Sequence, residues 1–120
     1  MAHILLVDDE TILLCVMETL LRDAGHTVST AETAAAAFPL LTQHNPALVI
    51  CDVMLPGQTG IDFYTAARTH LGDACPPFLF ISAYEPSHAR RMLATHTGVG
   101  FISKSFQIDD LLAAVTAALN

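Results

Sequence analysis

Positive charge is scarce in this sequence. Its 120 residues include five lysines and arginines against twelve aspartates and glutamates, which gives a formal net charge of −7 at neutral pH. A domain with this balance repels phosphate backbones and anionic lipid headgroups. We therefore expect no direct contact with nucleic acid or with a membrane surface.

Cysteine is also scarce, and long apolar runs are absent. Cys15, Cys51 and Cys75 are odd in number, lie far apart and form no C-x-x-C pattern, so neither disulfides nor a zinc site is supported. No leader-like segment opens the chain, and no apolar stretch reaches the roughly 18 residues that a membrane span needs. We expect a soluble protein of the reducing cytoplasm.

What remains is the composition of a globular domain. Apolar residues make up 52% of the sequence, and a chain of this length is long enough to bury one hydrophobic core. It contains no linker and no low-complexity tract, and no repeat beyond an alternation of short and long segments. We therefore expect one domain over residues 1–120.

Short apolar runs alternate with longer helix-like segments. The runs are apolar throughout, which is typical of strands that are covered on both faces of a parallel sheet. Such strands are joined by crossover helices that lie on both sides of the sheet. The sequence therefore predicts an α/β fold with a doubly wound, five-stranded parallel sheet. The predicted strands are residues 3–7, 27–30, 47–51, 78–81 and 98–102.

Helix signals fill the segments between these strands. Gly25 ends the first helix and Pro46 follows the second, whereas Pro39 within the second helix predicts a distorted or shortened element. The first helix is predicted over residues 11–24, and the third, fourth and fifth over residues 59–71, 87–96 and 108–119. The first of these is expected to carry an apolar stripe of Ile12, Cys15, Val16, Thr19 and Leu20.

Reactive side chains gather at the ends of the predicted strands. The carboxyl ends of parallel strands form the ligand-binding edge of a doubly wound sheet, so these side chains should meet. Lys104 is the only lysine of the sequence and stands just after an apolar strand. Strand one is followed by Asp8, Asp9 and Glu10, strand three by Asp52, strand four by Ser82 and strand five by Lys104.

This set of groups has a definite chemistry. One ammonium cannot neutralise Asp8, Asp9 and Asp52 together, and hard carboxylate ligands suit Mg²⁺, with Mn²⁺ as a second choice. A carboxylate beside such a metal and a lysine has the parts needed for phosphoryl transfer. Asp52 is the best nucleophile candidate, although an aspartate after a strand is equally often a helix cap or a turn residue.

Four motifs together resemble a known family. "LLVDDE", "VICDVMLPGQTG", "FISAYE" and "GFISKSF" occur in the order and at the spacing of the receiver domains of two-component response regulators. The resemblance covers essentially the whole chain. It implies a (βα)5 flavodoxin-like fold with strand order 2-1-3-4-5. It also implies that Asp52 accepts a phosphoryl group from a phosphohistidine of a sensor histidine kinase or a histidine phosphotransfer protein.

The same resemblance implies a metal site. Asp9 would bind the metal directly, Asp8 would act largely through water, and Asp52 and the main-chain carbonyl of Met54 would complete the protein's ligands. Glu10 either assists this acidic edge or serves as a charge in the first turn of a helix.

Further residues carry roles implied by the family. Ser82, the backbone amide of Ala83 and Lys104 would each bind one phosphoryl oxygen. Phe101 matches a switch aromatic, or is simply a core residue of the fifth strand. Tyr84 is placed where it could shield the phosphoryl group from water and slow autodephosphorylation, or is an ordinary loop aromatic. The output face would be helix four, strand five and helix five.

One position departs from the family pattern. Most receivers follow the lysine with a proline in a cis peptide bond, whereas this chain has Ser105. A cis bond to serine costs roughly 2.5 to 4 kcal/mol. The bond is therefore either trans with a rearranged loop, or cis and strained.

The leading hypothesis is a phosphorylatable signalling switch with a downstream effector domain or protein and, on activation, a possible homodimer. Such a switch catalyses only its own phosphorylation and dephosphorylation and is not an enzyme acting on other substrates. A pseudo-receiver that binds partners without phosphate chemistry is the alternative. A small phosphatase with an aspartyl nucleophile is a weaker one, because it would need an acid two residues after Asp52, where Met54 stands.

Overall fold

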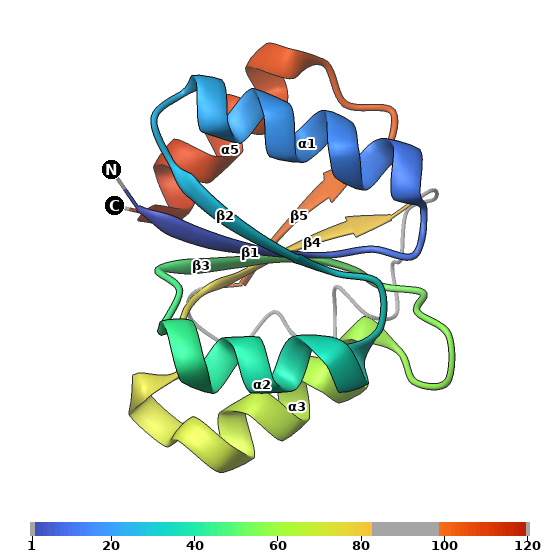
Figure 1. The fold of residues 1–120 in the computed structure, drawn as a ribbon, viewed down its shortest axis with the longest axis vertical. Helices are drawn as coiled ribbons and strands as arrows, with labels where there is room; N and C mark the ends of the chain where they lie inside the picture. The colour runs from blue at the N-terminus through green and yellow to red at the C-terminus, as the bar shows by residue number, and fades with distance from the viewer. Residues whose placement is uncertain (1, 83–98, 120) are drawn as a thin grey trace.

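Strands and helices alternate along the chain (Figure 1). The computed structural model describes residues 2–82 and 99–119. The strands are β1 (His3–Val7), β2 (Thr27–Ala31), β3 (Leu48–Asp52), β4 (Phe78–Ser82) and β5 (Val99–Ser103). The helices are α1 (Thr11–Asp23), α2 (Ala34–His44), α3 (Gly60–Leu71) and α5 (Ile108–Leu119), and a 3₁₀ turn covers Gly72–Ala74. The helix predicted over residues 87–96 lies outside the described residues.

All five strands are parallel and pair in the order β2-β1-β3-β4-β5. This confirms the doubly wound sheet and the flavodoxin-like strand order. The predicted strand limits are correct to within one residue. Because β1 and β3 are neighbours, with Val7 opposite Cys51, the residues that follow these strands emerge side by side.

Each face of the sheet carries its own core. α1 and α5 cover one face, and α2 and α3 cover the other (Figure 1). In β1, Ile4 and Leu6 pack on the α1/α5 side, whereas Leu5 and Val7 pack on the α2/α3 side. Successive strand residues point to opposite faces, so a strand covered on both faces is apolar at every position.

The buried face of α1 differs from the predicted stripe. Leu14, Met17 and Leu21 are buried, whereas Ile12 is 81% exposed and Val16 is 47% exposed. Residues 12–17 are all apolar, so more than one face of this helix could have been assigned to the core. The stripe prediction was therefore wrong, because the buried face of α1 is rotated by about one residue from the predicted face.

α2 runs without interruption across Pro39, so the expected shortening does not occur. The proline removes one backbone donor, but Ala37 and Leu41 on either side of it are buried against the sheet. This packing holds the helix, which starts at a Thr33 cap and ends at Asn45 in the left-handed conformation (φ 45°). None of the helices in the described part of the chain is long and apolar enough to cross a membrane.

Candidate functional site

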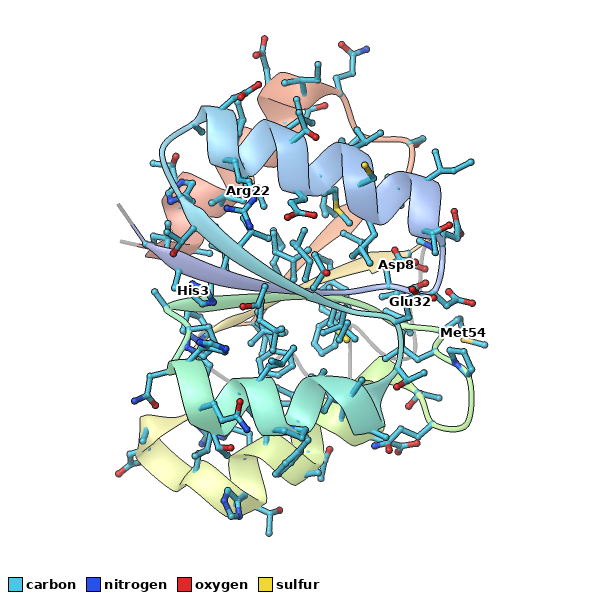
Figure 2. All side chains as sticks on the ribbon, viewed as in Figure 1. His3, Asp8, Arg22, Glu32 and Met54 are labelled. Carbon is cyan, nitrogen blue, oxygen red and sulfur yellow. The ribbon has the colours of Figure 1, made fainter. Side chains whose placement is uncertain are left out.

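The topology places Asp8 and Asp52 next to each other. Asp52 is the last residue of β3 and Asp8 directly follows β1. Both continue the set of alternate residues that point to the α1/α5 side, which includes Leu6 and Ile50. Figure 2 shows Asp8, Glu32 and Met54 at one end of the molecule, with His3 at the opposite end.

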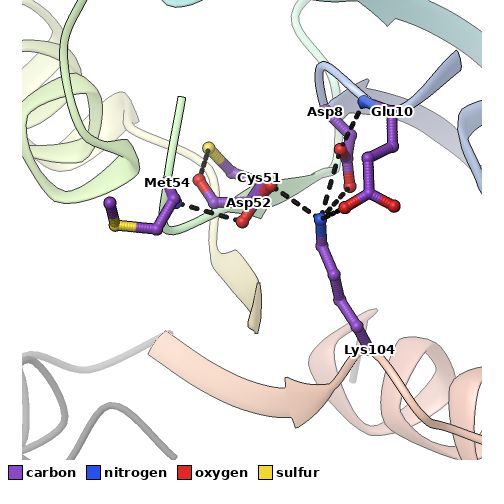
Figure 3. Close-up of polar contacts among 6 residues, drawn as sticks. All are labelled: Asp8, Glu10, Cys51, Asp52, Met54 and Lys104. Atoms are coloured by element: carbon purple, nitrogen blue, oxygen red, sulfur yellow. Dashed lines mark hydrogen bonds and ion pairs between the residues drawn. The ribbon is translucent and has the colours of Figure 1, made fainter. Parts of the chain in front are cut away.

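Lys104, which directly follows β5, extends its side chain toward the two acids (Figure 3). Its Nζ atom donates to Asp52 Oδ2 at 2.8 Å and to Glu10 Oε1 at 2.6 Å, and it lies 3.4 Å from Asp8 Oδ2. The lysine is held at its backbone, because its N–H donates to the carbonyl of Ser82 at 2.7 Å. The end of β4 therefore positions the cation that faces the ends of β1 and β3.

Both aspartates are buried and bound by the backbone. Asp8 is 0% exposed and Asp52 is 3% exposed. The N–H of Glu10 donates to Asp8 Oδ1 at 2.9 Å, and the N–H of Met54 donates to Asp52 Oδ1 at 3.0 Å. Each carboxylate is thus fixed through one oxygen and presents the other to the site.

The pKa values of Asp8 and Lys104 reflect the short distances between the charged groups of the site. The pKa of Asp8 is raised to about 6, mainly by burial and in smaller part by the Asp52 charge, although the Glu10 N–H and Lys104 oppose the rise. Burial alone lowers the pKa of Lys104, but the hydrogen bonds to Asp52 and Glu10 outweigh it and leave that pKa well above its ordinary value. Lys104 is therefore a permanent cation that only partly compensates the acids.

The residues present fit a divalent metal. Asp8, Glu10 and Asp52 each offer a carboxylate oxygen, and these oxygens lie within 4.8 Å of one another. Asp8 Oδ2 is buried and receives no hydrogen bond from the described residues, although Lys104 Nζ is 3.4 Å away. A buried carboxylate oxygen without a donor, within a set of hard oxygen ligands, suits Mg²⁺ or Mn²⁺.

The other predicted site residues that the structure describes are not part of this group of carboxylates and lysine. Asp9 is exposed and is not a member of this group of carboxylates. Ser82 is buried at the end of β4, and the Met54 side chain is 61% exposed. Phe101 is half-buried with its ring stacked on Phe80 at 5.5 Å. Ala83 and Tyr84 lie outside the described residues.

Two open questions of the sequence are answered here. The Lys104–Ser105 peptide bond is trans, and Lys104 nevertheless reaches Asp52. Glu10, for which the sequence left two readings open, has its carboxylate at the acidic edge and forms the shortest of the Lys104 ion pairs. The signal for this role was its place as the third acid of "DDE".

Replacing Asp8 with asparagine should stabilise the metal-free protein. At pH 7.5, above its raised pKa, ionised Asp8 costs folding free energy because it is buried beside Asp52. Asparagine keeps the oxygen that accepts from Glu10 and removes the charge. We expect the free energy of unfolding in EDTA to rise by about 1–2 kcal/mol, measured by urea denaturation.

Magnesium should reverse this order. A metal that binds only the folded state raises the free energy of unfolding more, the more tightly it binds. Because Asp8→Asn lacks one carboxylate, Mg²⁺ should raise its free energy of unfolding less than that of wild type. If Asp8→Asn were less stable than wild type in EDTA, the ionised Asp8 carboxylate could not be destabilising the metal-free protein.

The fold and the acid–lysine group define a class of signalling domain. A family model of the response regulator receiver domain matches residues 4–116, and the chain belongs to this family. It is 31% identical to the transcriptional regulatory protein KdpE of Mycobacterium tuberculosis, over 99% of this chain and 51% of KdpE. It is 28% identical to the virulence transcriptional regulatory protein PhoP of Salmonella typhimurium, over 99% of this chain and 52% of PhoP. The chain thus spans about half the length of these relatives.

A solved structure shows the same likeness in three dimensions. The chemotaxis protein CheY4 of Vibrio cholerae matches with a TM-score of 0.91 and 26% identity, and the match covers 99% of both chains. Receiver domains are signalling switches, and the resemblance inferred from the four motifs is confirmed at the level of the family.

Proposed function

We propose that this chain is a phosphorylatable signalling switch of a two-component or phosphorelay system, with Asp52 as the phosphoacceptor. The observation that supports this best is the position of Asp52, which is buried at the end of β3 with Oδ2 2.8 Å from the only lysine of the chain. A structural aspartate at a strand end has no need of a buried cation and two further acids.

The proposed reaction transfers a phosphoryl group from a phosphohistidine of a sensor kinase or a phosphotransfer protein. An Asp52 carboxylate oxygen forms a new O–P bond while the N–P bond to the donor imidazole breaks. The electron pair of that bond returns to the imidazole nitrogen, which then takes up a proton. The products are an aspartyl phosphate and a neutral histidine.

The residues of this chain would have separate roles in the proposed reaction. Lys104 pairs with a phosphoryl oxygen, and the Met54 N–H keeps the carboxylate in place through Oδ1. Asp8, Asp9, Asp52 and the Met54 carbonyl are proposed to hold Mg²⁺, or Mn²⁺ in its place. When bound, the metal supplies positive charge to the phosphoryl oxygens and screens the acids from the incoming anion.

The remaining roles also belong to this proposal. Ser82 and the amide of Ala83 bind phosphoryl oxygens, Tyr84 limits access of water, and Phe101 moves with the phosphorylated state. The Phe101 ring already stacks on Phe80, so a change at the end of β4 can reach β5 through direct contact. Its output is proposed to appear on the face formed by β5, α5 and residues 87–96.

Exposed apolar side chains beside the site suit a protein partner. Ile12 on α1 is 81% exposed, Val16 is 47% exposed and Met54 is 61% exposed. Such side chains next to a polar site are typical of protein contact surfaces. KdpE and PhoP are named as transcriptional regulators, so we propose a downstream effector domain or protein and a homodimer on activation. Nucleic acid would be contacted by the effector.

The test is phosphorylation by a small-molecule donor. Purified protein with Mg²⁺ and acetyl phosphate should gain the mass of one phosphoryl group, and Asp52→Asn should abolish the gain. The matched control Asp73→Asn replaces an exposed aspartate in the 3₁₀ turn and should behave as wild type.

Other outcomes would point elsewhere. No adduct on folded wild type would favour a pseudo-receiver, and turnover of an added phosphoester would favour a phosphatase. An adduct that persists in Asp52→Asn would place the phosphoacceptor at another residue.

A further inference from the structure

Lys104 is bound by a carboxylate that the proposed reaction does not use. Glu10 Oε1 lies 2.6 Å from Nζ, closer than Asp52 Oδ2 at 2.8 Å or Asp8 Oδ2 at 3.4 Å. The Lys104 side chain is only 12% exposed, whereas that of Glu10 is 59% exposed. The lysine is therefore fixed at the site, while Glu10 reaches in from the surface.

Apart from its place in the candidate metal group, Glu10 has no other role among the described residues. It stands at the position before α1 with extended backbone (φ −86°, ψ 99°), but its side chain accepts no capping hydrogen bond from the helix. Its described side-chain contact is with Lys104, 94 residues away in the sequence. Substituting this side chain therefore removes no helix cap.

The ammonium has a limited number of bonds to give. A lysine has three N–H donors, and here they face three carboxylates. When Asp52 carries a phosphoryl group, new acceptor oxygens appear beside Lys104. Glu10 then competes with those oxygens for the same cation.

We propose that Glu10 is a positioning residue that restrains Lys104 in the unphosphorylated state and thereby slows phosphorylation of Asp52. This inference rests on the proposed function, since it concerns the rate of that reaction. Glu10 loses its hold on Lys104 as the phosphoryl group arrives, so the contact favours the resting state.

The experiment uses the fact that Lys104 is the only lysine. Protein labelled with ¹³C,¹⁵N-lysine gives a single side-chain Nζ signal, which reports directly on this ammonium. We compare wild type, Glu10→Gln and Glu32→Gln in EDTA, and then measure phosphorylation by acetyl phosphate at saturating Mg²⁺. Glu32 is an exposed glutamate at the same end of the molecule as Asp8 (Figure 2), so its substitution makes the same charge change without a described contact to Lys104.

Glu10→Gln should shift the Lys104 signal and raise the phosphorylation rate about two- to fivefold, the scale of an exposed ion pair. Glu32→Gln should leave both unchanged. An unmoved Lys104 signal in Glu10→Gln overturns the inference, and so does a rate increase that is equal in the two variants, because general anion repulsion would then explain it. If wild type gains no phosphoryl group, the proposed function has failed and the inference falls with it.

Discussion

Replacing Lys104 with methionine should lower the phosphorylation rate and raise the affinity for Mg²⁺. Methionine keeps the apolar length of the side chain and removes the charge. We expect phosphorylation by acetyl phosphate to slow by roughly a hundredfold, because a positioned cation at a developing negative charge is worth about that much. We expect Mg²⁺ to bind more tightly, by roughly tenfold.

The second effect follows from the crowding of the site. In the metal-free protein the ammonium lies within 3.4 Å of oxygens from Asp8, Glu10 and Asp52, and these same carboxylates form the candidate metal group. Two cations that share ligands repel each other. For a divalent and a monovalent cation about 5 Å apart this repulsion is worth roughly 2–7 kcal/mol for effective dielectric constants between those of water and a protein surface. Even the lower end corresponds to roughly tenfold or more in affinity, so its loss favours the metal.

The matched control is Arg68→Gln, which removes one positive charge from an exposed position on α3. It should change neither Mg²⁺ affinity, measured by calorimetry, nor the phosphorylation rate. Weaker metal binding in Lys104→Met would contradict the account, because it would mean that the lysine supports the metal site instead of competing with it.

The positions of the reactive groups follow from local rules that the sequence displays. Apolar runs without alternation indicate parallel strands covered on both faces, and such strands deliver their last residues to one edge. Asp8, Asp52 and Lys104 could therefore be brought together before any coordinates were known. The contacts at 2.8 and 3.4 Å confirm that they meet.

Other features depend on packing that a sequence does not display. Six consecutive apolar residues on α1 give no single stripe, and only the docked helix shows that Leu14, Met17 and Leu21 face the core. The role of Glu10 depends on where a lysine 94 residues later places its ammonium. Ser105 in place of the family's proline left the reach of that lysine open. With a trans bond to Ser105, the Lys104 N–H donates to the Ser82 carbonyl, and this bond holds the lysine backbone at the end of β4.

The same dependence on packing makes Gly60 a sensitive position. Gly60 is buried at the start of α3, where its N–H donates to the Val53 carbonyl at 2.8 Å. A Cβ atom at Gly60 would lie 2.2 Å from the Asp52 carbonyl oxygen and 3.0 Å from Cys51 Sγ. The closest obstacle is backbone, so no side-chain rotation relieves the overlap, and the end of β3 must move.

Gly60→Ala should therefore lower the free energy of unfolding and disturb the phosphoacceptor together. In a helix this substitution ordinarily stabilises by up to about 1 kcal/mol. Here overpacking should outweigh that gain and leave a net loss of about 1–3 kcal/mol. Because Asp52 itself is displaced, the phosphorylation rate of the folded variant should fall at least about tenfold. Urea denaturation and intact-mass kinetics measure the two effects.

Gly100→Ala is the matched control. Among the residues that the structure describes, a Cβ atom at Gly100 in β5 meets only the end of the Leu79 side chain, at 3.2 Å, which can turn aside. Its stability should stay within about 1 kcal/mol of wild type and its phosphorylation rate should be unchanged. If Gly60→Ala matched wild type in both measurements, the tight packing of α3 against the end of β3 could not be what holds Asp52 in place.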